Sequence, residues 1–152
     1  STDDDKRSRL WQARHNAYFA ALDLRPGCRA MATDVCVPIS RLAECIEETE
    51  KDVSRSSLDI TILGHVGDGN FHLVIVFDPS SRQERAEAES LNRRVIERAL
   101  AMEGTCTGEH GIGIGKLNEL EREQGEAIHV MRAIKTALDP LNIMNPGKVL
   151  KM

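Results

Sequence analysis

The chain is poor in several features that mark common functional classes. Aromatic residues make up 3% of its 152 residues, and 20 Lys and Arg residues against 24 Asp and Glu residues give a formal net charge of −4. This balance argues against nucleic acid as a partner, because a phosphate backbone is held by clustered cations. No apolar run reaches the ~18 residues of a membrane-spanning helix. The four cysteines form no C-x-x-C pair and no secretory signal precedes them, so we expect reduced thiols in an intracellular protein.

What the chain does contain is enough apolar sequence, 41% of its residues, for one globular domain. Apolar spacing predicts helices over residues 9–22, 41–53 (with Ser40 as N-cap), 82–102 and 117–138, and strands over residues 28–38, 58–66, 71–77 and 104–107. From the first strand onward the order is strand, helix, strand, strand, helix, strand, which is that of a ferredoxin-like fold. We therefore expect an α+β protein whose antiparallel sheet carries helices on one face, with further helices at the C-terminus.

The turn between the two middle strands brings two histidines together. Gly67-Asp68-Gly69-Asn70 separates these strands, and Asp-Gly is a strong hairpin signal. With Asp68 and Gly69 as a two-residue loop, His65 lies directly opposite His72, with Cβ atoms roughly 4.5 to 5.5 Å apart. Two imidazoles so placed can ligate one zinc ion or a neighbouring first-row metal ion. The alternative is that both are ordinary half-buried strand residues.

Candidates for a third ligand stand in a glycine-dense segment. Residues 107–111 read TGEHG, so Glu109 could bind a metal ion while the adjacent His110 faces a substrate. His110 is a candidate general base, since imidazole exchanges protons near neutral pH. The glycines would let a flat ligand approach the backbone, whereas the alternative is a flexible surface loop. Residues 111–116 (GIGIGK) match neither the G-x-G-x-x-G fingerprint nor the P-loop, which argues against a nucleotide site of either kind.

Two cations outside these motifs are ambiguous. Arg14 lies on the first helix beside Trp11 and His15, where a guanidinium could grip a carboxylate with two hydrogen bonds. It could equally be a solvated helix residue. Lys148 follows Asn145 in NPGK, and NPG is also simply a good turn.

Three separated motifs resemble one enzyme family. They are GHVGDGNFH (residues 64–72), GTCTGEHGIGIGK (residues 104–116) and LDPLNIMNPGKVL (residues 138–150). In this order they resemble the C-terminal part of FAD-linked oxidases of the vanillyl-alcohol-oxidase (PCMH) type that act on D-2-hydroxy acids. Within that group, LWQARHN (residues 10–16) and TDVCVPISRL (residues 33–42) are most similar to the cytochrome-linked D-lactate dehydrogenases.

The resemblance implies a role for each candidate residue. His65, His72 and Glu109 would hold a divalent metal, zinc or manganese, and His110 would take the substrate's hydroxyl proton while FAD accepts the C2 hydride. Arg14 would pair with the substrate carboxylate. Four residues would lie against the flavin, namely Gly108, Gly111, Asn145 and Lys148. The implied reaction is the oxidation of D-lactate to pyruvate, with electrons passed on to cytochrome c or a quinone.

Two positions favour a substrate with one carboxylate. Relatives that resemble D-2-hydroxyglutarate dehydrogenase carry a lysine and an asparagine where this chain has Ala32 and Val74. A second substrate carboxylate would lack those partners here, which favours D-lactate.

The resemblance also implies that part of the enzyme lies elsewhere. The family's FAD-binding domain precedes these motifs and has no counterpart in residues 1–152, so we interpret the whole chain as the C-terminal substrate- and metal-binding domain, inactive by itself. Its partners would be a small 2-hydroxy acid, the upstream FAD domain and the electron acceptor, in a mitochondrion or a bacterial cytoplasm. Exposed flavin-facing surface would favour either self-association into a homo-oligomer or a mobile glycine loop. The competing interpretations are a metal-binding or interaction module without catalysis, and a relative of glycolate or D-2-hydroxyglutarate dehydrogenases.

Overall fold

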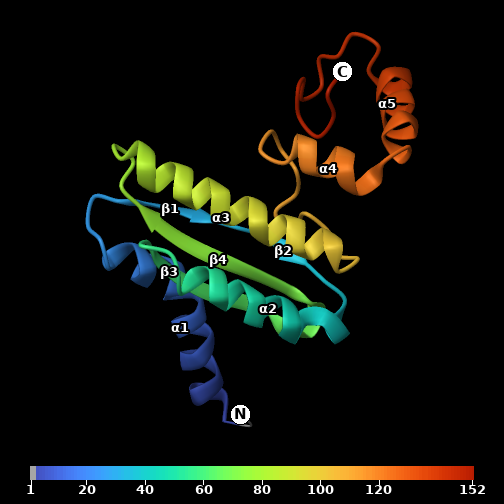
Figure 1. Ribbon diagram of the computed structural model, residues 1–152. Coiled ribbons are helices and arrows are strands. Elements are labelled where there is room, and N and C mark those ends of the chain that lie inside the picture. The colour runs from blue at the N-terminus through green and yellow to red at the C-terminus, as the bar shows by residue number, and fades with distance from the viewer. Residues whose placement is uncertain (1–2) are drawn as a thin grey trace.

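The computed structural model describes residues 3–152, so residues 1 and 2 of the expected domain lie outside the described part. This part of the chain forms five α-helices and one four-stranded sheet (Figure 1). The helices are α1 (Asp4–Asp23), α2 (Ile39–Val53), α3 (Arg82–Ala101), α4 (Leu117–Gln124) and α5 (Ala127–Leu138). The strands are β1 (Arg29–Ala32), β2 (Val35–Cys36), β3 (Asp59–His65) and β4 (Asn70–Phe77), with a short 3-10 turn, η1 (Val66–Asp68), between the last two.

β4 is the central strand of the sheet. It pairs antiparallel with β3 along one edge and with β1 and β2 along the other. A single bridge between Cys36 and Thr105 continues the sheet beyond β2. The strand expected over residues 104–107 is therefore reduced to this bridge. The α+β prediction is confirmed, and the strand neighbours are those of a ferredoxin-like sheet.

The strand expected over residues 28–38 is split in two by Thr33 and Asp34. Oγ1 of Thr33 accepts a hydrogen bond from the backbone N–H of Leu73 at 2.8 Å, while its own N–H donates to the Leu73 carbonyl at 2.9 Å. A side chain has thus taken the place of a backbone ladder partner. Asp34 can then turn its carboxylate away from the sheet, toward the loop that carries Glu109.

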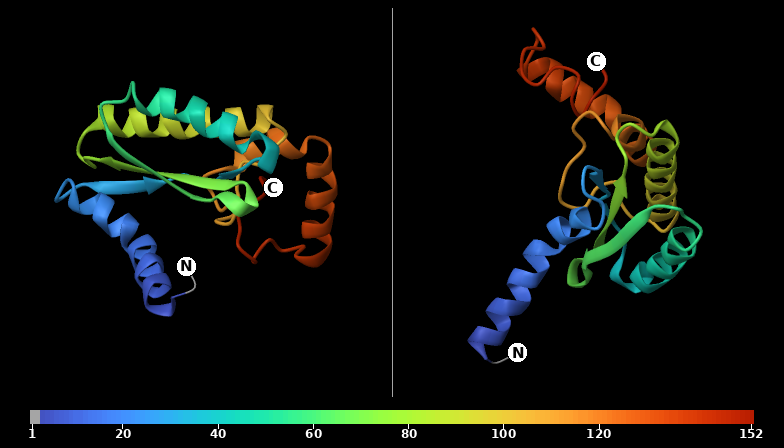
Figure 2. Two further views of the ribbon diagram at one scale, coloured as in Figure 1. Left: turned by 90° about the horizontal axis from the view of Figure 1, so that it is seen from below. Right: turned by 90° about the vertical axis from the view of Figure 1, so that its left-hand side faces the viewer.

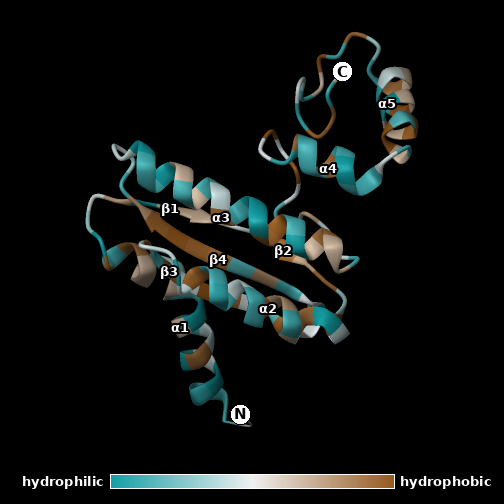
Figure 3. Cartoon of the chain, viewed as in Figure 1, coloured by the Kyte–Doolittle hydropathy of each residue, from teal (hydrophilic) through white to brown (hydrophobic). Residues whose placement is uncertain are grey.

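The main core lies between one face of the sheet and the pair α2 and α3. Every residue of β4 is buried, and its alternate residues Phe71, Leu73, Ile75 and Phe77 belong to the cluster that includes the apolar residues of these two helices. Figure 2 shows α2 and α3 together on this face, and α1 on the opposite face. α1 packs through its C-terminal end, where Ala21 meets Val74 and Val76. In Figure 3, β4 changes along its length from hydrophilic to hydrophobic colouring, and its hydrophilic end is where the candidate residues lie.

The helices lie where the apolar spacing of the sequence predicts them, but the predicted N-cap of one helix is wrong. Ser81 caps α3 by accepting a hydrogen bond from the N–H of Glu84 at 3.2 Å. The prediction that Ser40 caps α2 is wrong, because the helix begins at Ile39 and its cap is Pro38, which makes no side-chain cap bond. Proline is tolerated there because the N-cap residue is not yet helical, with φ −49° and ψ 136°, and needs no N–H for the helix ladder.

The C-terminal helices α4 and α5 lie beside the sheet rather than against either face (Figure 1). They follow the predicted region over residues 117–138, interrupted at Gly125, whose φ is 51°. The tail folds back along them, where the Arg132 side chain donates to the Lys151 carbonyl at 2.8 Å. Within residues 3–152, no helix combines the length and apolar character needed to cross a membrane.

Candidate active site

The β3–β4 hairpin places the two histidines on one face of the sheet. His65 pairs with Asn70, and His72 pairs with Leu63. The predicted direct pairing of His65 with His72 is wrong, because the connection includes the 3-10 turn and the register is displaced by two residues. Side chains alternate with a period of two along a strand, so this displacement leaves both histidines on the same face. Their rings lie edge to face with centroids 5.9 Å apart.

The glycine-rich loop brings Glu109 and His110 to these histidines. Oε1 of Glu109 lies 3.3 Å from Nε2 of His65 and 3.1 Å from Nε2 of His72. The ring of His110 stacks on that of His72, with centroids 5.1 Å apart and planes 11° apart. His72 is buried and the other three are partly open to solvent. The structure therefore brings together the four residues for which the sequence predicted metal binding and proton transfer.

The hydrogen-bond partners of the two rings identify which nitrogens carry a hydrogen. Nδ1 of His72 lies 3.0 Å from the Thr33 carbonyl oxygen, which can only accept, so Nδ1 is the donor. Nε2 of His65 lies 2.7 Å from Nη2 of Arg14, which can only donate, so this Nε2 is an acceptor. In neutral form the His72 ring thus directs its Nε2 lone pair toward the Glu109 carboxylate, whereas the single lone pair of His65 Nε2 accepts from Arg14. The two Nε2 atoms and Oε1 of Glu109 still lie close together, and His65 can serve as a ligand once the Arg14 guanidinium turns to an anionic partner. Two histidines with one glutamate are a known zinc set.

Arg14 reaches this cluster from α1. A cavity of about 150 Å³ opens beside it. Its lining comes from α1, from three strands and from the glycine-rich loop: Arg14, Tyr18, Ala32, Leu63, His65, His72, Val74, Glu109 and His110. The lining combines charged or polar side chains with three apolar ones, Ala32, Leu63 and Val74. The cavity can therefore hold a small molecule that has an anionic end and an apolar end.

Asp34 is a site residue that the sequence analysis did not identify. Its side chain is 1% exposed and its carboxylate accepts hydrogen bonds from five groups. These are the Asn70 amide at 2.8 Å, the Thr107 hydroxyl at 2.7 Å and the backbone N–H groups of Gly108 at 2.8 Å, Glu109 at 3.1 Å and His110 at 3.0 Å. Burial alone raises the pKa of the carboxyl, but these hydrogen bonds outweigh burial and hold the pKa of Asp34 well below its ordinary range.

Lys116 was also missed. Its ammonium donates to the carbonyl oxygens of Asp34 at 2.6 Å and Cys106 at 2.7 Å, so it joins the end of the glycine-rich loop to its start. Burial lowers the pKa of Lys116, while the nearby Asp34 carboxylate opposes that change. In the sequence, Lys116 is only the last residue of GIGIGK, a glycine-rich segment of the kind found in phosphate-binding motifs.

The four residues expected against the flavin fall into three situations. A Cβ on Gly108 would lie 1.8 Å from Nδ2 of Asn70, so this glycine is required by the packing of the loop on β4. Gly111 has a φ of 78° and nothing within 4 Å of a Cβ position, which leaves its backbone open. Asn145 and Lys148 lie in the tail, and within residues 3–152 no hydrogen bond or ion pair joins them to the histidine cluster. Their contact with a flavin stays a prediction.

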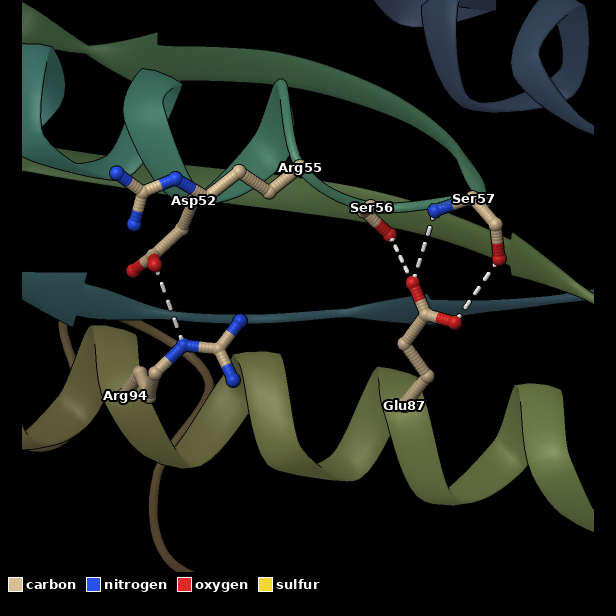
Figure 4. Close-up of a pocket in the computed structure, with 6 residues that line it drawn as sticks. All are labelled: Asp52, Arg55, Ser56, Ser57, Glu87 and Arg94. Carbon is tan, nitrogen blue, oxygen red and sulfur yellow. Dashed lines mark hydrogen bonds and ion pairs between the residues drawn. The ribbon is translucent and has the colours of Figure 1, made fainter.

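A larger hollow of about 550 Å³ lies elsewhere, between the end of α2 and α3 (Figure 4). Its carboxylates already have partners. Glu87 accepts from Ser56 at 2.5 Å and from the hydroxyl and N–H of Ser57 at 2.9 Å, and Asp52 lies 3.3 Å from Arg94. These bonds hold the two helices and the following loop together, so we interpret the hollow as a feature of helix packing.

Comparison with known proteins places this geometry in a family. The family model described as FAD linked oxidases, C-terminal domain, matches residues 1–149. A protein named probable D-lactate dehydrogenase, mitochondrial, from Danio rerio is 56% identical over 99% of this chain and 30% of its own length. A protein named D-lactate dehydrogenase [cytochrome], mitochondrial, from Arabidopsis thaliana is 52% identical over 96% of this chain and 26% of its own length.

A solved structure supports the fold independently. The 4-ethylphenol oxidase from Gulosibacter chungangensis superposes with a TM-score of 0.67 over 97% of this chain and 31% of its own, at 22% identity. The chain thus spans under a third of the length of the two relatives and of this structure. On its sequence and its fold, the chain belongs to the family of FAD-linked oxidase C-terminal domains.

Proposed function

We propose that this chain is the C-terminal substrate- and metal-binding domain of an FAD-dependent D-2-hydroxy-acid dehydrogenase that oxidises D-lactate to pyruvate. The single observation that carries the proposal is the convergence of Glu109 and the two histidine Nε2 atoms at the mouth of a small cavity. Arg14 and His110 line the same cavity, so one pocket offers a cation site, a carboxylate partner and a base.

The donor set fits a divalent metal. His65, His72 and Glu109 would hold zinc or manganese, and the two nitrogens with one oxygen suit either ion. When bound there, such an ion would lower the pKa of a hydroxyl group that contacts it. The Thr33 carbonyl contributes by holding Nδ1 of His72, which keeps the Nε2 lone pair directed at the site.

The remaining residues orient the substrate and move a proton. Arg14 would bind the carboxylate of the 2-hydroxy acid through its fork of N–H donors. His110, fixed by stacking on His72, would accept the hydroxyl proton as C2 is oxidised. Positioning of this kind can lower a barrier by roughly 7 to 11 kcal/mol in the best intramolecular cases.

The apolar residues of the cavity lining fit a substrate with a small side chain. Ala32 and Val74 are direct partners in the β1–β4 ladder, and Leu63 lies beside them in the cavity lining. Among the residues that line the cavity, Arg14 is the single lysine or arginine, so a second substrate carboxylate would have no such partner there. The methyl group of D-lactate would pack there.

FAD is the cofactor of the family and would accept the hydride from C2. The open backbone at Gly111 supports contact with a flat ring on this side of the loop. Gly108, Asn145 and Lys148 are proposed flavin contacts on the strength of the family resemblance. The relatives' names favour a mitochondrial location and a cytochrome-type electron acceptor.

The test is dye reduction by the full-length, FAD-loaded protein with D-lactate, glycolate, D-2-hydroxyglutarate and L-lactate. We expect D-lactate to give the highest kcat/KM. The His110→Ala variant should lose about 100-fold or more of the rate, the usual contribution of a general base. His129→Ala is the matched control, because this histidine is 70% exposed on α5 and should leave the rate unchanged.

Two outcomes would contradict the proposal. A folded, FAD-loaded protein that oxidises none of these acids would favour a metal-binding module without catalysis. A His110→Ala rate equal to that of His129→Ala would remove His110 as the base. A preference for glycolate would keep the mechanism and change the substrate.

A further inference from the structure

The backbone of the loop that carries Glu109 and His110 is organised around one buried carboxylate. Three consecutive backbone N–H groups, those of Gly108, Glu109 and His110, all donate to Oδ2 of Asp34 at 2.8 to 3.1 Å. The Thr107 hydroxyl donates to the same oxygen at 2.7 Å. One oxygen therefore accepts four hydrogen bonds from this turn of the loop, while the next N–H, that of Gly111, donates to the Thr107 hydroxyl oxygen at 2.9 Å.

This arrangement restricts a segment that would otherwise be free to move. Glycine at 108 and 111 gives the loop a wide choice of backbone conformations. Hydrogen bonds from three successive peptide groups to one fixed acceptor leave only one orientation for those peptide planes. The side chains of Glu109 and His110 are then directed toward the histidines of β3 and β4.

Asp34 is itself held in place from the other side. Its Oδ1 accepts from the Asn70 amide at 2.8 Å, and the same amide also donates to the Val35 carbonyl at 2.9 Å. Oδ1 lies 3.5 Å from Nδ1 of His72. The Lys116 ammonium, which donates to the Asp34 carbonyl, closes the base of the loop. Asp34 thus connects the rigid half of the site, on β4, to the loop half.

We propose that Asp34 is a positioning residue that sets Glu109 and His110 in the geometry needed for metal binding and proton transfer. The inference rests on the proposed function of the His65, His72 and Glu109 site. Asp34 contacts neither substrate nor metal in this scheme. It acts through the loop backbone, and partners of this kind often change metal affinity 10- to 100-fold when they are altered.

The obvious variant is Asp34→Asn, which keeps the size of the side chain. An amide nitrogen on one side of residue 34 would face either the loop N–H groups or the Asn70 amide, so donors would oppose donors. Because this change is buried and could prevent folding, a second variant is needed. Thr107→Val removes one hydroxyl donor to Asp34 and keeps the shape of the side chain. It also removes the acceptor of the Gly111 N–H, so Gly111 is left out of the comparison of loop exchange.

The matched control is Asp52→Asn. Asp52, near the C-terminal end of α2, is a partly buried carboxylate that accepts a hydrogen bond from Arg98 of α3 at 2.5 Å. Its other ion-pair partner is Arg94, as Figure 4 shows, so its contacts lie between α2 and α3. Its replacement should lower stability without touching the site. It therefore separates a general loss of stability from an effect on the loop.

The experiment uses the full-length, FAD-loaded protein and two measurements that do not depend on turnover. Zinc affinity is measured by competition with a chromophoric chelator, and amide hydrogen exchange of residues 108–110, whose N–H groups donate to Asp34, is measured in EDTA. We expect Asp34→Asn to weaken zinc binding 10- to 100-fold and Thr107→Val to weaken it several-fold. Both should speed exchange in the loop, and Asp52→Asn should do neither.

The outcomes separate this inference from the proposed function. A wild-type protein that binds no divalent metal refutes the proposed site and the inference with it. Wild-type binding with unchanged zinc affinity and unchanged loop exchange in Thr107→Val and in a folded Asp34→Asn overturns the inference alone. If Asp34→Asn does not fold, the result for Thr107→Val decides.

Discussion

Replacing Glu109 with glutamine should act in opposite directions on the metal-free and the metal-loaded protein. The Glu109 carboxylate lies 3.3 Å from Nε2 of His65, which accepts from Arg14, and 3.1 Å from Nε2 of His72, which carries a lone pair. A glutamine amide can donate a hydrogen bond to one of these nitrogens, where a carboxylate cannot. Such a bond contributes about 0.5 to 1.5 kcal/mol, and the lower end applies because the side chain is 49% exposed. Without metal, Glu109→Gln should therefore be as stable as the wild type or slightly more stable.

With metal, the same variant should be less stable than the wild type. At a free zinc concentration of 100 times the wild-type Kd, binding stabilises the wild type by about 2.7 kcal/mol. If the loss of one of three ligands weakens affinity about 100-fold, the same zinc concentration stabilises the variant by only about 0.4 kcal/mol. The difference of about 2 kcal/mol is easily resolved by urea unfolding.

The assay is urea unfolding of wild type and variant, each in EDTA and in buffered zinc. Glu126→Gln is the matched control, because Glu126 also lies beside one histidine, His129 at 3.7 Å, but as the fully exposed N-cap residue of α5. It should keep the full zinc-dependent gain. The reasoning is refuted if Glu109→Gln gains as much from zinc as the wild type, or if it loses more than about 1 kcal/mol in EDTA.

Three further predictions concern stability and the loop. Leu73→Ala, in the centre of β4 and 0% exposed, should lower the free energy of unfolding by about 2 to 5 kcal/mol in urea, and a loss below 1 kcal/mol would contradict the assigned core. Burial raises the pKa of Asp52, but the hydrogen bonds and positive charges of Arg98 and Arg94 together outweigh burial and hold the pKa below the ordinary 3.8. Above pH 3.8 the wild type should therefore be more stable than Asp52→Asn by the full amount, about 1.5 to 3 kcal/mol. This advantage should disappear as the pH falls through the depressed pKa of Asp52. A stability difference that does not change with pH would contradict this. Gly108→Ala places a Cβ 1.8 Å from the Asn70 side-chain amide and should weaken zinc affinity 10-fold or more. Gly115→Ala is the control, because open space surrounds that position, and it should leave zinc affinity unchanged. Equal zinc affinities of the two variants would refute the packing argument.

Local patterns predicted the helices and the residue types of the site well. α3 matches its predicted range within one residue, because an amphipathic stripe and a serine cap act within the segment itself. The hairpin was predicted with the wrong loop, yet both histidines were placed on the correct face. A displacement of two residues preserves the face of every side chain, so the chemistry of the hairpin is less sensitive to register than its geometry.

Long-range backbone contacts could not be predicted in the same way. Asp34 appears in sequence as one polar residue in a strand-like run, and its partners are backbone N–H groups 74 to 76 residues away. Every residue except proline has such a group, so the partners leave no trace in residue type. The polar pair Thr33-Asp34 within an apolar run was the one available signal. The split of the expected strand between β1 and β2 follows from the same pair.

The position of the site residues along the chain has a consequence for the order of folding. His65 and His72 belong to one hairpin, whose ends meet after a short loop closure, whereas the contacts of Asp34 with the Glu109 loop close a loop of more than 70 residues. Closing long loops costs more chain entropy, so contacts of this kind form late. His65 and His72 should therefore lie side by side before the Glu109 carboxylate reaches them. An intermediate that traps a metal ion on the hairpin alone would hold it with two ligands, and the third ligand would join only as the last native contacts form.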